Sequence, residues 1–447
     1  MPKLKMLRTL LRTFSMMFMI ILVTPSGVLS ASSDTTLEKA VSAKNIEEIE
    51  IAVAKLAMNG TAIDMEAVIN EALLSDQPEV EQAALRGLKR LSPGVGLSWL
   101  CTQAKEHSRK QVRDLLMTYL ATRKDGESFK AVLQGLYDPE DSVVLSAISA
   151  LLKKDHNGCI PHLIRALRFQ EDKDKDLSLV AEKLRETMRE LTGADLFAAS
   201  EWDSLWKGNR KKLEKQEKLD PSKIVMKGSG VKVTPLKFFG HELVSQKIVF
   251  ILDTSISMKA KDPKVELEGV GEKNNPGKGT GVNRKRDQDD KNADDLPDSR
   301  MRLRRVQKEL KRMVRELPKS FQFCLISFDA DVEQMSQQLL KANPNQKRRA
   351  MKFIDGFDPE GFTSTDLALD AAFAINGVRT IVLLSDGMPY RAANPIDGSA
   401  LLDNIDALNR FEHIPIHTIG FRATSGSAST FLEELSRRSG GKYTEIP

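Results

Sequence analysis

Apolar residues between about positions 35 and 192 recur at the three- and four-residue spacing of amphipathic helices. The first four of these stripes begin at Ile49, Val80, Val112 and Val143, at steps of 31, 32 and 31 residues, and a fifth begins at Val180. The stripes are Ile49, Val53 and Ala57; Val80, Ala84 and Leu88; Val112, Leu116 and Leu120; Val143, Ala147 and Leu151; and Val180, Leu184 and Met188. A near-constant period of this length is typical of solenoids in which each helix pair packs against its neighbours. The pattern predicts a helical repeat domain over residues 35–206.

The second half of the chain alternates short apolar runs with helical stretches. Apolar runs cover residues 247–253, 321–328, 380–385 and 414–419, and helical patterns cover 301–316, 365–376, 399–411 and 429–438. A continuous apolar run suits a central parallel strand that is buried on both faces. Strands that alternate with helices predict a doubly wound, Rossmann-like α/β domain with a mostly parallel central sheet. We place this domain at residues 241–447.

A lysine-rich stretch separates the two predicted domains. Trp202 and Trp206 share one helical face. We interpret them as an aromatic lid on the last repeat, because the ends of a solenoid need capping, and a docking patch is the alternative. Beyond them lysines are frequent and apolar residues are few, which predicts a linker over residues 207–240.

The amino terminus has the pattern of a secretory signal peptide. Basic residues occupy positions 3–12, an apolar run follows from Phe14 to Val23, and small residues follow from Ser30. This order predicts a signal peptide at residues 1–30 and export of the chain to the periplasm or cell envelope, or its secretion. The apolar run is short for a membrane span. An uncleaved anchor is the alternative, and it would be the chain's predicted contact with a membrane.

Charge and cysteine content exclude some classes of function. The formal net charge of +5 is small for 447 residues, so nucleic acid is not an expected partner. Three cysteines, an odd number, cannot all pair within the chain and do not form a disulfide framework. We expect buried free thiols, with one disulfide pair as the alternative.

Oxygen-bearing side chains follow the predicted strands at the positions where α/β sheets bind ligands. Asp253, Ser255 and Ser257 come directly after the first apolar run, Asp386 follows a later one, and Thr363 lies just before a predicted helix. In an open α/β sheet the carboxyl ends of the strands line the binding crevice. Carboxylate and hydroxyl oxygens are hard donors, which suit Mg²⁺ or Mn²⁺. The five residues therefore predict a divalent-cation site.

These residues carry a resemblance to a known family. The ordered set Asp253-x-Ser255-x-Ser257, Thr363 and Asp386-Gly387, with later matches at 416–420 and 440–443, resembles the von Willebrand factor type A domain and its metal-ion-dependent adhesion site (MIDAS). The resemblance implies that Ser255, Ser257 and Thr363 bind the ion directly, while Asp253 and Asp386 act mainly through water. It also implies that an Asp or Glu carboxylate of a protein partner completes the coordination. The helical half resembles short HEAT-like repeats.

One stretch departs from the family pattern, which has a short turn after the first motif. Residues 259–300 contain no aromatic residue and ten each of Lys/Arg and Asp/Glu. Low hydrophobicity and high charge predict a disordered insertion. A spacer is one interpretation, and a segment that gates the metal loop or binds a partner is the other.

The predicted function is an exported adhesion or assembly module that captures an acidic group of a protein partner through a divalent cation. The sequence shows no Ser, His and Asp arrangement and no Cys and His pair for catalysis, so we do not expect an enzyme. Two alternatives remain open. One is a metal-dependent hydrolase, and the other is a structural scaffold in which the helical repeats bind the partner.

Overall fold

The computed structural model describes residues 35–153, 157–219, 236–243, 245–262, 296–391, 394–421 and 426–446. The chain divides between Leu100 and Cys101 into two compact units, each described separately below. The predicted signal peptide lies outside the described residues, as do residues 220–235 of the predicted linker. In the described part of the chain, no helix combines the length and apolar character that a membrane crossing requires. The export prediction and the linker boundaries therefore stay predictions.

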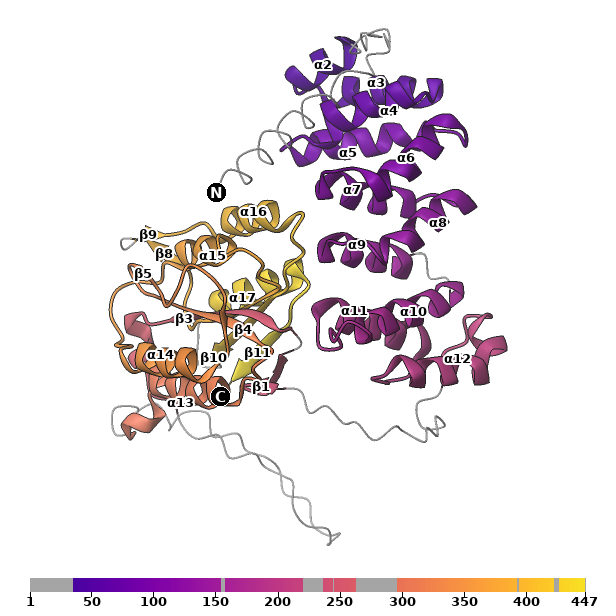
Figure 1. The fold of residues 1–447 in the computed structure, drawn as a ribbon. Helices are drawn as coiled ribbons and strands as arrows, with labels where there is room; N and C mark the ends of the chain where they lie inside the picture. Colours follow the sequence, from indigo (N-terminus) through magenta and orange to yellow (C-terminus); the bar gives the residue numbers. More distant parts are fainter. Residues whose placement is uncertain are drawn as a thin grey trace, which may run out of the picture. The chain divides into compact units, whose positions relative to one another are not determined.

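The described part of the first unit, from Thr35 to Leu100, is helical (Figure 1). Its helices are α2 (Thr35–Ser42), α3 (Ile46–Asn59), α4 (Ala62–Val68), the π-helix η1 (Ile69–Leu73), α5 (Pro78–Gly87), the 3-10 helix η2 (Leu88–Arg90) and α6 (Val95–Glu106), which runs into the second unit. Helix α3 packs between α2 and α5. A Cβ atom at Gly87 would lie 2.8 Å from both the Glu50 carbonyl oxygen and Val53 Cβ, so glycine permits the close approach of α5 to α3.

The second unit continues the helical array. Its helices are α7 (Lys110–Ala121), α8 (Gly126–Gly135), α9 (Asp141–Lys153), η3 (Asn157–Cys159), α10 (Ile160–Glu171), α11 (Leu179–Thr192) and α12 (Ala199–Leu213). Every residue of the five predicted apolar stripes is buried, and the predicted helical region is confirmed. Trp202 and Trp206 are buried on α12, which packs on α10, so their positions favour the aromatic lid over a docking patch. All three cysteines are free, and Cys101 is only partly buried.

The remainder of the second unit is built on a mostly parallel sheet, as predicted (Figure 1). The strands of this domain are β1 (Leu236–Phe238), β2 (His241–Leu243), β3 (Lys247–Asp253), β4 (Gln322–Phe328), β5 (Val332–Gln334), β6 (Leu340–Lys341), β7 (Thr380–Leu384), β8 (Tyr390–Arg391), β9 (Asn394–Pro395), β10 (Ile416–Phe421) and β11 (Tyr443–Ile446). The main sheet has the order β11-β10-β7-β3-β4-β5, and β6 also pairs with β4. Neighbours from β11 to β4 are parallel, whereas β5 and β6 pair antiparallel with β4. The predicted α/β fold is confirmed.

The position of β3 in this order explains where a ligand site can form. Strand β3 is followed in sequence by β4 on one side, and the chain then crosses over to place β7 on its other side. A crevice opens at the carboxyl end of a sheet where successive connections leave in opposite directions. The residues after β3 and β7 therefore lie at that crevice.

Helices cover the sheet and bury its apolar residues. They are η5 (Ile256–Lys259), η6 (Asp298–Arg300), α13 (Arg302–Glu316), α14 (Pro344–Asp355), α15 (Thr365–Phe373), α16 (Gly398–Asn409) and α17 (Gly426–Ser439). The residues from Ile248 to Asp253 are all buried, which is the environment predicted for a central strand. The rigid sheet thus holds the loops at its carboxyl edge.

Candidate metal centre

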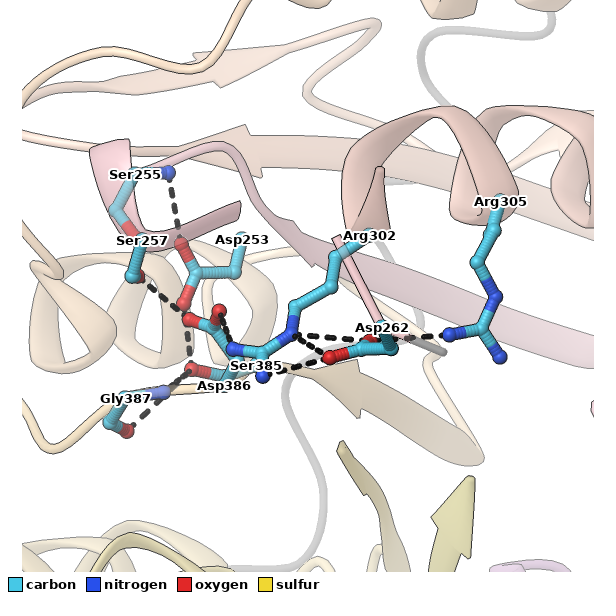
Figure 2. A network of polar contacts seen from close by, with 9 residues as sticks. All are labelled: Asp253, Ser255, Ser257, Asp262, Arg302, Arg305, Ser385, Asp386 and Gly387. Carbon is cyan, nitrogen blue, oxygen red and sulfur yellow. Dashed lines mark hydrogen bonds and ion pairs between the residues drawn. The ribbon is translucent and has the colours of Figure 1, made fainter. Parts of the chain in front are cut away.

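Asp253 and Ser385 lie side by side because their strands are paired in register. Leu252 of β3 is opposite Leu384 of β7, so the next residue of each strand emerges at the same edge. Ser385 Oγ donates a hydrogen bond of 2.5 Å to Asp253 Oδ2, and the backbone N–H of Ser255 donates one of 2.8 Å to Asp253 Oδ1 (Figure 2). Asp253 is fully buried. Its carboxylate therefore has one fixed orientation.

Ser255, Ser257 and Asp386 meet at the same edge (Figure 2). The Oγ atoms of Ser255 and Ser257 are 3.0 Å apart, and Ser257 Oγ donates to Asp386 Oδ1 at 2.6 Å. Asp386 and Ser255 are buried, whereas Ser257 is exposed, so the site reaches the surface at Ser257. Four of the five predicted ligands are thus joined by direct contacts.

The fifth, Thr363, reaches the site through the loop that carries Asp386. A Cβ atom at Gly387 would lie 3.3 Å from Thr363 Oγ1, so the hydroxyl lies against that loop. The Thr363 carbonyl oxygen also accepts a hydrogen bond of 2.9 Å from the Tyr390 backbone N–H. Thr363 is buried.

The donor set fits a small, hard cation. Adjacent ligands of an octahedral Mg²⁺ with bonds near 2.1 Å are about 3.0 Å apart, which is the spacing that Ser255 and Ser257 Oγ already have. Ser257 and Asp386 are closer than this, at 2.6 Å, which suits a hydrogen bond between an ion-bound hydroxyl and an outer carboxylate. Within the described residues, no cluster of three or more His, Cys, Asp or Glu side chains is placed to hold a metal.

An arginine side chain, Arg302, contacts this site through the Asp386 carboxylate. Arg302, the first residue of α13, donates from Nη1 to Asp386 Oδ2 at 2.7 Å, and from Nε and Nη2 to Asp262 at 2.9–3.1 Å (Figure 2). Arg305, one turn later, donates to Asp262 Oδ2 at 3.0 Å. Because Arg302 holds Oδ2 of Asp386, the other oxygen, Oδ1, faces Ser257. Arg302 is therefore a positioning residue for Asp386.

Burial sets the electrostatics of Asp253. Loss of contact with water and the nearby Asp386 carboxylate raise the pKa of Asp253 to about 7, although hydrogen bonds from Ser255 and Ser385 act in the opposite direction. An ionised Asp253 is therefore costly unless a cation lies nearby. The site has the electrostatic character of a cation-binding centre.

Asp262 and Arg302 also join the two ends of the predicted insertion. Lys261 and Met301 form an antiparallel bridge, and the backbone N–H of Arg302 donates to the Ala260 carbonyl oxygen at 2.9 Å. The prediction of disorder over 259–300 is wrong at both ends, because Lys261 Nζ donates to the Leu296 carbonyl oxygen at 2.7 Å and the Asp262 backbone N–H donates to the Arg300 carbonyl oxygen at 3.2 Å. Residues 259–262 and 296–300 lie in or beside η5 and η6. Residues 263–295 lie outside the described residues.

Sequence reasoning missed Ser385, Asp262 and Arg302. Ser385 could have been found, since it follows an apolar strand directly and precedes Asp386. Asp262 and Arg302 are 40 positions apart in sequence, so no linear spacing connects them. Only the fold brings them to the same carboxylate.

Comparison with known proteins identifies this part of the chain. A family model described as the von Willebrand factor type A domain matches residues 297–444. These residues form a von Willebrand factor type A domain, and the resemblance seen in the sequence is confirmed. The match begins at residue 297, near the end of the predicted insertion, yet β3 and its Asp253 lie between β4 and β7 in the same sheet. The first motif is therefore part of this domain in space.

Two human proteins are similar to a segment of the chain. Von Willebrand factor A domain-containing protein 3B is 31% identical over 121 residues, which cover 27% of this chain and 9% of that protein. Von Willebrand factor A domain-containing protein 3A is 26% identical over 121 residues, which cover 27% of this chain and 10% of that protein. The chain thus matches about a tenth of the length of these relatives.

Solved structures are similar in fold only. A von Willebrand factor type A protein from Catenulispora acidiphila is 15% identical, with a TM-score of 0.33 over 46% of this chain and 40% of that chain. BatB from Bacteroides thetaiotaomicron is 15% identical, with a TM-score of 0.29 over 44% of this chain and 89% of that chain. A third structure is that of proximal thread matrix protein 1 from the mussel byssus, with a zinc-occupied MIDAS motif. It is 15% identical, with a TM-score of 0.28 over 44% of this chain and 40% of that chain.

Proposed function

We propose that this protein is a binding module that holds a divalent cation, Mg²⁺ or Mn²⁺, and uses it to capture an Asp or Glu carboxylate of a protein partner. The observation that carries the proposal is the meeting of Ser255, Ser257 and Asp386 at the carboxyl edge of the sheet, with two hydroxyl oxygens at the spacing of adjacent Mg²⁺ ligands. Ser255, Ser257 and Thr363 would hold the ion directly. Asp253 and Asp386 would hold it through water.

The charges around the site support a single acidic group on the partner. The ionised network drawn in Figure 2 contains more carboxylates than guanidinium groups, and its charged members are Asp253, Asp262, Asp386, Arg302 and Arg305. With Asp253 ionised, as a bound cation would favour, this set has a net charge of one negative unit, and the divalent cation would change the total to one positive unit. One carboxylate from the protein partner would bring the net charge of the site to zero. The bound cation would supply an open coordination position for that carboxylate.

The proposal is tested by metal-dependent capture. Short immobilised peptides with a central Asp, or with Asn in its place, are incubated with the full chain in Mg²⁺ and in chelator. We expect retention on the Asp peptides in Mg²⁺, with loss in chelator, on Asn peptides, and in the Ser255→Ala/Ser257→Ala variant. Retention that survives both the chelator and the double substitution would contradict the metal hypothesis and favour binding by the helical repeats.

We further propose that the mature chain is exported. The proposal rests on the basic, apolar and small-residue order of positions 1–30. Amino-terminal sequencing of the protein recovered from its native cells tests it. A mature chain that begins near Ala31 is expected, and an intact amino terminus in a soluble cell fraction would contradict export.

A further inference from the structure

Large apolar side chains gather at the surface around the candidate metal centre. In the described part of the α/β domain, from residue 236 onward, the large apolar side chains that are exposed are Ile256, Phe362, Leu367, Tyr390 and Leu408. All except Leu408 lie in the ligand-bearing loops or in the helical turn that follows Thr363. Exposed groups of such side chains mark interaction surfaces. We name Ile256, Phe362, Leu367 and Tyr390 the apolar collar.

Each collar residue is exposed although one of its two neighbours in sequence is buried. Ile256 is 53% exposed between the metal-site serines, and Phe362 is 43% exposed directly before the buried Thr363. Tyr390 is 39% exposed and Leu367 is 36% exposed. Ser255 and Thr363 are therefore buried in the site, while the adjacent apolar side chains of Ile256 and Phe362 lie at the surface.

Contacts between the loops hold the collar together. The Ile256 backbone N–H donates to the carbonyl oxygen of Gly361, the residue before Phe362, at 3.3 Å. The Tyr390 backbone N–H donates to the carbonyl oxygen of Thr363, the residue after Phe362, at 2.9 Å. Asp366 and Arg391, which adjoin Leu367 and Tyr390, form an ion pair. The collar therefore borders the metal centre as one surface.

We propose that the apolar collar and the metal centre form a single docking surface for a protein segment that presents one Asp or Glu flanked by apolar side chains. This inference rests on the proposed metal-dependent function and specifies its partner. The acidic group would bind at the cation, and the flanking side chains would cover the collar. Aromatic side chains that become buried on binding, such as that of Tyr390, are typical of the residues that dominate binding energy.

Charge favours a single acid over an acidic run. Asp366 is paired with Arg391, and the exposed charges near the collar include one basic residue, Lys259, and two acidic residues, Glu360 and Asp370. Additional acidic groups on a partner would find no excess of positive charge there and would approach Glu360. Apolar flanks would instead meet Phe362 and Tyr390. The surface therefore selects for apolar context as well as for the carboxylate.

The test uses the full chain and four immobilised peptides. Each has a central Asp or Asn, and its flanking residues are either Leu and Phe or Ser and Gln. In Mg²⁺ we expect the Asp peptide with apolar flanks to bind about tenfold more tightly than the one with polar flanks. The Phe362→Ser/Tyr390→Ser variant should lose this preference while its Mg²⁺ affinity, measured by calorimetry, stays unchanged.

Leu408→Ser is the matched control. Leu408 is 42% exposed, but it lies in the last turn of α16, which leads to the amino end of β10 at the opposite edge of the sheet. This variant should keep the preference.

The outcomes separate the collar from the metal function. Equal Mg²⁺-dependent binding of both Asp peptides overturns the collar and leaves the metal function intact. If the peptides with apolar flanks bind equally well with Asn in place of Asp, or equally well in chelator and in Mg²⁺, the metal function is contradicted. The inference, which rests on it, then fails as well. A fall in the sedimentation mass of the Phe362→Ser/Tyr390→Ser variant, without a change in peptide binding, would assign the collar to contact with a second copy and overturn the inference.

Discussion

Arg302 donates a hydrogen bond of 2.7 Å from Nη1 to Oδ2 of Asp386, and both side chains are buried. The guanidinium is therefore a resident positive charge on a carboxylate that we assign to the metal centre. It fixes the orientation of Asp386 and also offsets part of its charge in the absence of metal.

Replacement of Arg302 by Met should destabilise the metal-free chain strongly. It leaves the buried Asp262 and Asp386 carboxylates without their main cation, and loss of one partner of a buried ion pair typically costs about 3–5 kcal/mol. Mg²⁺ should then raise the melting temperature of the variant by more than that of the original chain, because the ion becomes the main positive charge near Asp386. Thermal unfolding with and without Mg²⁺ measures both effects.

Arg304→Met is the control for this experiment. Arg304 lies on the same helix, but it is half exposed, lies 3.9 Å from Asp358 and donates one hydrogen bond of 2.8 Å to Gln307 Oε1, without contact to the metal-site carboxylates. Exposed pairs contribute about 0–1 kcal/mol, so this variant should unfold like the original chain. Equal Mg²⁺ responses of all three proteins would contradict the role assigned to Arg302.

Replacement of Asp253 by Asn should have opposite effects with and without metal. The pKa of Asp253 is raised from 3.8 to about 7, first by burial and then by Asp386. The folded chain therefore binds this proton more tightly than the unfolded chain, and metal-free stability should fall as the pH rises from about 4 to about 7.

The Asn side chain removes this titration and can keep the contacts with Ser255 and Ser385. At pH 8 in chelator the Asp253→Asn variant should be more stable than the original chain, and it should gain nothing from Mg²⁺. Melting temperatures over a pH series, in chelator and in Mg²⁺, test the pair of effects. A variant that is less stable in chelator and still responds to Mg²⁺ would refute this account of Asp253.

Replacement of Gly387 by Ala should weaken metal binding while the fold is retained. The new Cβ would lie 3.3 Å from Thr363 Oγ1, so the hydroxyl must shift by a few tenths of an ångström. Octahedral coordination of Mg²⁺ tolerates little displacement of its ligands. Calorimetry should show a lower Mg²⁺ affinity with little change in melting temperature. Gly426→Ala, where a Cβ meets nothing within 4 Å, is the control. The same Mg²⁺ affinity in both variants would argue against Thr363 as a ligand.

Replacement of Gly87 by Ala should destabilise the helical array. Its Cβ would lie 2.8 Å from Val53 Cβ, which forces α5 away from α3, and overpacking of this kind typically costs about 1–3 kcal/mol. Gly126→Ala, in open space at the start of α8, should be neutral or stabilising. Denaturant unfolding compares the two. A Gly87→Ala chain as stable as the control would contradict the close packing of α3 and α5.

The sequence predicted the elements that have strong apolar patterns. The runs at 247–253 and 380–385 correspond to β3 and β7, and the stripes of the first half lie on buried helix faces. Helix α14 and strands β5 and β6 were not predicted. The two strands are only two or three residues long, and α14 has few buried apolar residues. Their patterns were too weak to recognise.

The candidate ligands were predictable because the fold places the ends of parallel strands at one edge. Asp253 and Asp386 each follow an apolar run, so their meeting follows from the topology. Arg302 was not predictable in the same way. Its partners are Asp262 and Asp386, which are 40 and 84 positions away, and only side-chain geometry in the folded domain brings the three together.

The most direct test of the central claim is calorimetric titration of Mg²⁺ and of Mn²⁺ into the full chain and its Ser257→Ala variant. Ser257 is exposed and joins Ser255 to Asp386, so its replacement removes a proposed direct ligand with little risk to the fold. Ser204→Ala, on the exposed face of α12, is the control. We predict saturable binding of one ion per chain that is weakened at least about tenfold by Ser257→Ala alone. Binding that is equal in all three proteins would contradict the assigned metal centre.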